Sequence, residues 1–536
     1  MIGGLDPLEG AQICQIEQFG DWYRDPCSWP ELEWVISNPA EFPMSDVITQ
    51  RGPEFSMKEK VRFEPIMVPK SSLGARPAVL MTLDAKIAYH AAGVRLLKKM
   101  HRELPDWVYG WRFRDGAPKP GVAKNGDEWD QYSVFYARQP KHITHALQTD
   151  ITSFFGSIEV GRMAEMLLDA TGRNAPAQVL VDVIQQHDNL QTRSGLPQRS
   201  WTSAFLANLY VRAIDDTLDD RLRRGSIDGV ARWMDDIQIV GKEESLYRLF
   251  ADLQDRFREI GLEPNSSKSK LLPISDMRQG FHLDILDRLE IPTKKSLIGM
   301  GSGGWVRVDS TDEDLTTLFE LEEAVLDQIH ICPPNIVKRL LIELRNRLLF
   351  ERFDSWLEQA CRLPHLAATL SRYFREGIHG DEADSATRRE AYVNWFTNFI
   401  SSDWSALPWV SAQYATAISS AHCDDSGLKD ILRGWLSTSE DLQQVSLAGQ
   451  RLSAVDPKCV RDLVRRRADS EARPLFQRSL ALIALTASDN KRLVETIISQ
   501  DAHNVITARF LDASRYAIPA ISADFDIAHR IKRQRA

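Results

Sequence analysis

Two adjacent aspartates inside an apolar, β-prone stretch constrain the fold of this chain more than any other feature. Residues 230–240 read Val-Ala-Arg-Trp-Met-Asp-Asp-Ile-Gln-Ile-Val, so runs rich in β-branched and aromatic residues flank Asp235 and Asp236. The simplest structure is a hairpin with both acids at or near its tip. One aspartate in a turn would indicate nothing, but two adjacent carboxylates repel each other. The pattern therefore favours a cation that neutralises both.

A third aspartate lies in similar surroundings. Residues 145–158 predict a short strand that ends at Asp150 and is followed by a turn and a helix. Hard oxygen ligands from the ends of different strands can hold Mg²⁺. A pair of such ions activates a hydroxyl nucleophile and stabilises a leaving pyrophosphate. That is the chemistry of a polymerase palm.

The order and spacing of several segments resemble reverse transcriptases over about residues 60–290. Lys70 and Arg76 fall where fingers residues grip a triphosphate in that family. The other matching segments are Val108–Arg112 in the fingers, Asp150 with Phe154 and Phe155, Gly195–Gln198 with Ser203 and Asn208, Trp233–Asp236, and Gly261–Lys268. The resemblance implies an α+β fold with the fingers and palm of a right-hand polymerase.

The resemblance also implies a metal site and its chemistry. Asp150, Asp235 and Asp236 would be the catalytic residues. Asp150 and Asp235 would be ligands of two Mg²⁺ ions, with Mn²⁺ as the alternative metal, and Asp236 would be a supporting acid beside them. Ile151 completes the predicted metal ligands.

The predicted nucleotide site follows from the same resemblance. Phe155 would be the steric gate that excludes a 2′-hydroxyl, so the predicted substrate is a dNTP and the product is DNA. Lys268 would lie near the leaving phosphates, and Lys70, Arg76 and Gln198 would also bind the nucleotide. A phenylalanine in such a position is more often a core residue than a gate.

Two departures from the family pattern stand next to the predicted nucleotide loop. Arg199 occupies the place after Gln198 where the family usually has glycine, and Trp201 follows closely. Two bulky side chains there are expected to crowd or reshape the path of a template. Trp233 replaces the usual Tyr or Phe before the paired aspartates, which is a milder change.

Changes in composition divide the chain into four parts. Residues 1–55, rich in aromatics and prolines, predict an irregular, packed lead-in, and residues 56–295 predict the fingers and palm. The glycine cluster at 299–304 indicates a linker or hairpin over 296–311. Helical periodicity then dominates residues 312–536, as in the stripe Val337, Leu340, Leu341, Leu344 and Leu348. Antiparallel helices stacked in a bundle or a HEAT-like solenoid would explain these stripes.

A palm joined to a long helical region resembles bacterial antiphage defence reverse transcriptases of the abortive-infection and unknown-group classes. No ribonuclease H pattern and no cysteine-rich endonuclease stands out after the palm. The resemblance implies antiviral defence and a homo-oligomer or RNA-bound particle. Its DNA synthesis would be primed by a protein hydroxyl, proceed without a conventional template, or use a non-coding RNA as template or primer. Tyrosines at 373, 392, 414 and 516 offer hydroxyls, although a tyrosine among packed helices is typically a core or rim residue.

Charge and composition leave other readings open. The net charge of −9 hides a basic stretch: residues 51–100 carry ten Lys or Arg against four acids, which suits either a phosphate-binding surface or a solvated helix face. No apolar run reaches the ~18 residues of a membrane span, and no signal peptide begins the chain, so we expect a cytoplasmic protein that does not enter a membrane. The alternative functions are an RNA-binding scaffold with the helical domain as effector, and a nucleotide cyclase.

Overall fold

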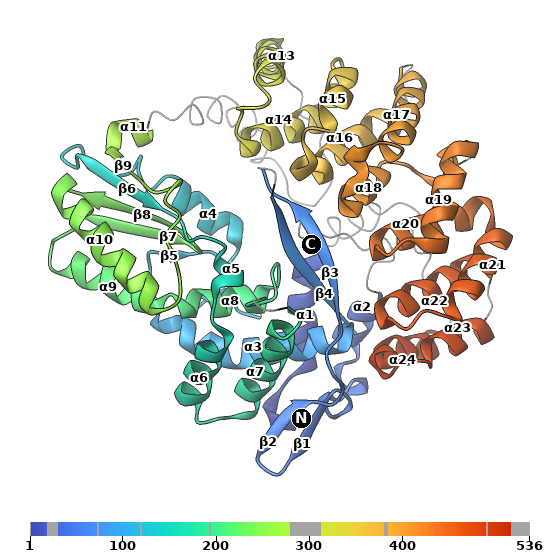
Figure 1. Cartoon of the computed structure of the whole chain (residues 1–536), viewed down its shortest axis with the longest axis horizontal. Coiled ribbons are helices and arrows are strands. Elements are labelled where there is room, and N and C mark those ends of the chain that lie inside the picture. Colours follow the sequence, from blue (N-terminus) through green and yellow to red (C-terminus); the bar gives the residue numbers. More distant parts are fainter. Residues whose placement is uncertain are drawn as a thin grey trace. The chain divides into compact units, whose positions relative to one another are not determined.

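The computed structural model describes residues 2–18, 30–71, 74–117, 120–191, 194–278, 312–379, 384–423, 425–488 and 491–515. The chain forms two compact units. The first comprises Met1–Phe19, Glu31–Glu64 and Ala78–Gly280, and the second comprises Gly20–Pro30, Pro65–Pro77 and Phe281–Ala536. Helices dominate both units and the sheets are small (Figure 1). None of the helices within these ranges is long and apolar enough to span a membrane.

Several sequence features fall outside the described residues. They are the glycine cluster at 299–304, the predicted linker at 296–311 and Tyr516. The boundaries proposed for the four parts of the chain stay predictions.

A five-stranded sheet forms the centre of the first unit, with the strand order β5-β7-β8-β6-β9. Its strands are β5 (Val108–Tyr109), β6 (His145–Thr149), β7 (Gly229–Trp233), β8 (Asp236–Gly241) and β9 (Lys270–Pro273). β5 runs parallel to β7, and the other neighbouring strands are antiparallel. β8 is buried over 237–241, as expected for a central strand made of Ile, Gln, Val and Gly. Helices α9 (Arg212–Arg223) and α10 (Glu243–Glu259) pack against this sheet (Figure 1).

The remaining helices of the first unit include α3, which is buried along most of its length. They are α1 (Pro7–Gln18), α2 (Pro30–Ser37), α3 (Leu83–Met100), α4 (Asn125–Ser133), α5 (Phe154–Ser157), α6 (Val160–Thr171), α7 (Ala175–Asp188), α8 (Trp201–Tyr210) and α11 (Ile274–Arg278). Two further strands, β1 (Ile48–Arg51) and β2 (Glu54–Met57), form a hairpin. The hairpin of β3 (Phe63–Pro69) and β4 (Ala75–Met81) contributes residues to both units.

The prediction of an irregular lead-in is wrong for α1. This helix packs closely on α3, because Gly10 lets the two backbones approach: a Cβ at Gly10 would lie 2.2 Å from the carbonyl oxygen of Ile87. Gly10 therefore supports a close helix contact instead of breaking the helix.

The C-terminal end of α1 carries a buried carboxylate, Glu17, that joins three elements. It accepts hydrogen bonds from the backbone N–H of Trp201, the first residue of α8, and from Lys86 Nζ at 2.7 Å. His90 Nε2 lies 3.2 Å from its Oε1. Burial opposes ionisation of Glu17, but His90 and Lys86 outweigh it and hold the pKa of this carboxyl at about 2. Lys86, one member of the basic stretch at 51–100, is thus part of the internal structure.

From residue 312 onward the described part of the second unit is helical, and no strand occurs within the described residues of 312–515. α14, α16, α18, α20 and α22 each contact the next helix of that series, while the odd-numbered helices pack beside them (Figure 1). This arrangement is compatible with the predicted stack of helices. The helices are α13 (Asp312–Asp327), α14 (Pro334–Arg347), α15 (Phe353–Ala360), α16 (Ala367–His379), α17 (Ser385–Ile400), α18 (Pro408–Ala415), α19 (Ser426–Thr438), α20 (Leu442–Val455), α21 (Pro457–Ala468), α22 (Pro474–Ser488), α23 (Lys491–Ile498) and α24 (Val505–Ala513).

Candidate active site

The paired aspartates lie at the tip of the β7–β8 hairpin, as the sequence predicts. Trp233 pairs with Asp236, which leaves Met234 and Asp235 as a two-residue loop. Met234 has a left-handed backbone with φ 58°, a conformation that costs a non-glycine residue roughly 1–2 kcal/mol. The surrounding contacts must therefore hold this turn in place.

Asp150 comes directly after β6 and meets the hairpin from the neighbouring strand. The last pair of the β6–β8 ladder is Thr149 with Ile237, so Asp150 and Asp236 are the next residues on the two strands. Asp150 is only 5% exposed, and Asp235 and Asp236 are half-buried. The strand register therefore brings Asp150 to the adjacent pair Asp235 and Asp236, from which it is far apart in the sequence.

The segment Gly261–Lys268 is hydrogen-bonded to the chain around Asp150. Lys268 Nζ lies 3.0 Å from Asp150 Oδ2, and Asn265 Nδ2 donates to the same oxygen at 3.2 Å. The backbone N–H of Asn265 donates to the carbonyl of Asp150 at 2.7 Å. Ile151 forms an isolated β-bridge with Pro264 and can offer a metal only its backbone carbonyl oxygen. The predicted Asn265 and Lys268 thus lie beside the predicted acid.

Crowding of these carboxylates shifts their titration. Burial, followed by the charges of Asp236 and Asp150, raises the pKa of Asp235 to about 7. Burial and the neighbouring Asp150 raise the pKa of Asp236 to about 6. Partial burial of Lys268 works against its charge, but the hydrogen bond and charge of Asp150 outweigh it and raise the pKa of the lysine. The cluster is short of positive charge.

The donor set suits a hard cation, although the side chains are not arranged around one. No group of three or more His, Cys, Asp or Glu side chains within the described ranges is positioned to hold a metal ion as it stands. Asp150 instead binds Lys268. Carboxylate and carbonyl oxygens are the ligands that Mg²⁺ and Mn²⁺ prefer, and a bound cation would relieve the repulsion that raises the two pKa values. Binding would require Lys268 or the carboxylates to move.

The loop before α8 packs directly on the predicted gate residue. The N–H of Leu196 donates to the carbonyl of Phe155 at 3.0 Å, and the N–H of Gly195 donates to Asp188 at 2.8 Å. Gly195 has φ +61°, and a Cβ there would lie 2.1 Å from the carbonyl oxygen of Phe155. Only glycine fits this position. Phe155 and Gln198 are both half-buried, on the two segments that this contact joins.

The residues that follow the loop have different environments. Arg199 is exposed with a left-handed φ of 66°, and Trp201 packs edge-on against Phe205 with ring centroids 6.1 Å apart. Ser203 is buried and contacts the hydroxyl of Tyr89 at 3.0 Å. Trp201 and Ser203 therefore support the packing of α8, while the path of a template past Arg199 stays a prediction.

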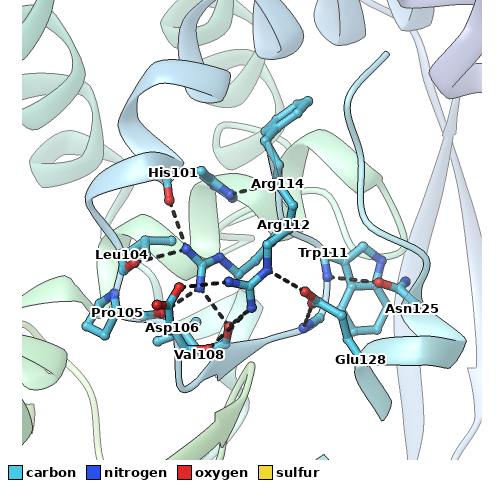
Figure 2. Close-up of polar contacts among 12 residues, drawn as sticks. His101, Leu104, Pro105, Asp106, Val108, Trp111, Arg112, Arg114, Asn125 and Glu128 are labelled. Atoms are coloured by element: carbon cyan, nitrogen blue, oxygen red, sulfur yellow. Dashed lines mark hydrogen bonds and ion pairs between the residues drawn. The ribbon is translucent and has the colours of Figure 1, made fainter. Parts of the chain in front are cut away.

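The fingers-like segment Val108–Arg112 has an internal structural role (Figure 2). Arg112 is 2% exposed, and its guanidinium donates to the backbone carbonyls of four residues: His101, Leu104, Pro105 and Val108. Glu128 accepts from the N–H of Gly110 at 2.6 Å and from Arg114 Nε at 2.7 Å. These contacts fix the chain that leads out of β5.

Trp233 packs into an aromatic cluster formed by the same part of the chain. Its ring centroid lies 5.5 Å from that of Trp111, 5.0 Å from that of Trp129 and 5.9 Å from that of Tyr132. A Cβ at Gly110 would lie only 3.1 Å from the Trp233 ring. The absence of a side chain at Gly110 therefore leaves room for Trp233 in place of the smaller Tyr or Phe.

Lys70 and Arg76 are exposed near the turn of the β3–β4 hairpin, within the stretch that belongs to the second unit. Their proposed contact with a triphosphate stays a prediction. Sequence reasoning singled out Asn208 but missed the buried Arg232 and Asp215, which together with Asn208 hold the turn at Met234 and Asp235. A basic residue inside the apolar run 230–233 was the signal that could have found it.

Residues 68–283 match the model of a protein family described as reverse transcriptase (RNA-dependent DNA polymerase). A reverse transcriptase domain is therefore present, and it spans the whole acidic cluster and the loop before α8. This domain indicates an RNA-directed DNA polymerase, which is a nucleotidyltransferase. No curated protein matches the chain.

Proposed function

We propose that this protein is a Mg²⁺-dependent DNA polymerase of the reverse transcriptase type that synthesises DNA from dNTPs in antiphage defence. The observation that carries the polymerase activity is the convergence of Asp150, Asp235 and Asp236 at neighbouring strand ends, inside a domain that matches reverse transcriptases. The fold we propose for residues 56–295 is that of fingers and palm, with a helical region in place of a thumb.

Asp150 and Asp235 would hold the metal ions, with the backbone carbonyl of Ile151 and the Asp236 carboxylate beside them. Bound Mg²⁺ supplies Lewis acidity that activates a primer hydroxyl and stabilises the leaving pyrophosphate. Lys268 would release Asp150 when metal binds and turn towards the leaving phosphates. Its side chain is 62% exposed, which leaves it room to move.

The remaining proposed roles concern the nucleotide. Phe155 would exclude the 2′-hydroxyl. The hydrogen bond from the N–H of Leu196 to the carbonyl of Phe155 would hold Phe155 at a fixed position relative to Gln198. Lys70 and Arg76 would bind the triphosphate. All of the residues proposed to bind the nucleotide lie within the matched span of 68–283. They are Lys70, Arg76, Phe155, Gln198 and Lys268.

The defence role and the mode of priming rest on the sequence resemblance. Protein priming, synthesis without a template, and a dedicated non-coding RNA stay alternatives, as do a homo-oligomer and a cytoplasmic location. Among the tyrosines considered as primers, Tyr373, Tyr392 and Tyr414 are fully buried. The hydroxyl of Tyr392 donates to the carbonyl of Tyr414, and that of Tyr414 donates to the carbonyl of Ala360, each at 2.8 Å. These three are core residues, which disfavours them as primers.

The deciding experiment measures incorporation of each labelled dNTP by the purified full-length protein in Mg²⁺, with and without nuclease pretreatment. Asp235→Ala combined with Asp236→Ala should abolish incorporation and phage protection together, with the fold intact by circular dichroism. Product lost after RNase pretreatment would identify a bound RNA as template or primer. Product that shifts on protease digestion would identify protein priming.

Two outcomes would replace the proposal. Full phage protection by an Asp150→Asn variant would favour an RNA-binding scaffold whose helical region is the effector. Cyclic product from ATP, with no polymer from dNTPs, would identify a nucleotide cyclase instead.

A further inference from the structure

The fully buried Arg232 lies three residues before Asp235, the first acid of the proposed catalytic turn. Its side chain has no exposed surface, and neither has that of its partner Asp215 on α9. Arg232 Nε donates to Asp215 Oδ1 at 2.7 Å and Nη2 donates to Asp215 Oδ2 at 2.6 Å. This two-pronged pair fixes the plane of the guanidinium.

The third nitrogen of the guanidinium faces the turn itself. Arg232 Nη1 donates to the carbonyl oxygen of Met234 at 2.9 Å and to Asn208 Oδ1 at 3.0 Å. The carbonyl of Met234 belongs to the peptide that enters Asp235. The hydrogen bond therefore fixes the peptide plane from which the Asp235 side chain projects.

Asn208 extends this network to the aromatic side of the hairpin. Its Nδ2 donates to the carbonyl of Gly110 at 2.8 Å and approaches that of Trp111 at 3.3 Å. The ring of Trp111 in turn packs on Trp233. Residues from α8, α9 and the loop after β5 thus converge on one two-residue turn.

Packing alone does not account for this arrangement. A fully buried ion pair commonly stabilises a protein no more than apolar residues of similar volume, because both charges lose their hydration. The turn that it contacts has a strained left-handed residue, Met234, and such residues persist where their surroundings over-determine them. The network thus acts at the backbone that presents Asp235.

We propose that Arg232 is a positioning residue for the metal-binding turn: clamped by Asp215 and Asn208, it holds the Met234 carbonyl and so sets the orientation of Asp235. This inference rests on the proposed function, because it assigns the support of a metal ligand. Arg232 itself contacts neither metal nor nucleotide.

The informative substitution is Arg232→Lys, which keeps the charge but has a single nitrogen. A lysine can satisfy Asp215 but cannot also fork to Asn208 and Met234. Loss of a group that orients a metal ligand typically lowers metal affinity or activity by about 10–100-fold. We expect this loss in Mn²⁺ affinity and in kcat, with a smaller change in the KM for dNTP.

Mn²⁺ binding is measured by electron paramagnetic resonance on the full-length protein without nucleotide, beside steady-state incorporation. The matched control is Arg451→Lys, which alters an equally buried arginine that donates to the carbonyl of Ile418 in the second unit. Both variants should lose thermal stability, but Arg451→Lys should keep Mn²⁺ affinity and kcat within twofold of wild type.

A milder variant covers the case in which Arg232→Lys does not fold. Asn208→Ser removes the amide contact and leaves the Arg232–Asp215 pair, so we expect a few-fold loss in Mn²⁺ affinity and kcat. Unchanged Mn²⁺ affinity and kcat in the folded variants, despite lower melting temperatures, would overturn the inference and leave Arg232 a purely structural residue. A wild-type protein without Asp235-dependent Mn²⁺ binding or incorporation would instead defeat the proposed function.

Discussion

Two sites of buried charge, one in each unit, are arranged in opposite ways. In the second unit, the buried Glu343 lies between Arg339 and Arg347 of its own helix, so its charge is matched locally. At the tip of the β7–β8 hairpin, Asp150, Asp235 and Asp236 crowd together, and Lys268 is the cation paired with Asp150.

We interpret this difference as the contrast between charge that stabilises the fold and charge that serves the proposed metal site. Matched charges satisfy one another and leave nothing to attract a ligand, whereas crowded carboxylates with raised pKa values lower the stability of the ligand-free protein. Each prediction below either widens or removes this contrast.

The largest effect should come from Asp235→Asn. Removing this proposed metal ligand should lower incorporation by about 10³-fold, which corresponds to roughly 4 kcal/mol of transition-state stabilisation. The same change removes a repelling charge, so the melting temperature of the metal-free protein should rise. Calorimetry and dNTP incorporation measure the two effects. Asp228→Asn, on the exposed side before β7, is the matched control and should change neither.

Glu343→Gln should have the opposite profile. It leaves the buried Arg347 without its charge partner, and breaking such a pair costs about 3 kcal/mol of unfolding free energy. Denaturant titration would measure this loss, with the exposed Glu358→Gln as control. Incorporation per folded molecule should stay at the wild-type level. A large loss of activity below the melting transition would show that charge in the second unit is not purely structural.

Phe155→Val tests the proposed steric gate. A smaller side chain would admit a 2′-hydroxyl, so discrimination between dNTP and the matching rNTP should fall by roughly 10²-fold. The ratio of kcat/KM values for the two substrates is the measurement. Phe154→Leu, which alters the buried neighbouring ring, should leave that ratio unchanged. Equal ratios in both variants would place the gate elsewhere.

The smallest effect is a pH dependence of stability in the metal-free protein. Folding raises the pKa of Asp235 to about 7 and that of Asp236 to about 6, from an ordinary 3.8. The folded state therefore holds more protons than the unfolded state between pH 4 and 7, so this contribution to stability is present at low pH and is lost as pH rises through that window. The difference in melting temperature between wild type and Asp235→Asn should therefore grow as pH rises from 4 to 7 and level off above that window. Parallel curves would contradict the crowding of the carboxylates.

Local patterns predicted the parts of the molecule that depend on neighbouring residues. Alternating β-prone runs around Asp235 gave the hairpin, and the stripe from Val337 to Leu344 gave a buried helix face. The prediction is wrong for the last residue of the stripe, Leu348. This residue follows the end of α14, has a left-handed φ of 59° and is 43% exposed. Apolar character continued there while the backbone had already turned.

Long-range polar partners were beyond the reach of the sequence. Asp215 lies 17 residues before Arg232, in a helix whose charged residues are otherwise typical of a solvated face. Nothing local distinguishes it from Asp216 or Asp219. The close approach of α3 to Gly10 likewise depends on residues that are distant in the sequence.

The carboxylate of Glu17 has a consequence for dissecting this protein. It lies outside the matched span of 68–283, yet it accepts from the first amide of α8, directly after the loop that contacts Phe155. An expression fragment that begins at residue 68 would strand His90 and Lys86 without that carboxylate. We therefore expect a stable truncated protein to need α1 as well. The limits of a family match show where sequences are similar, and they do not define the smallest fragment that folds.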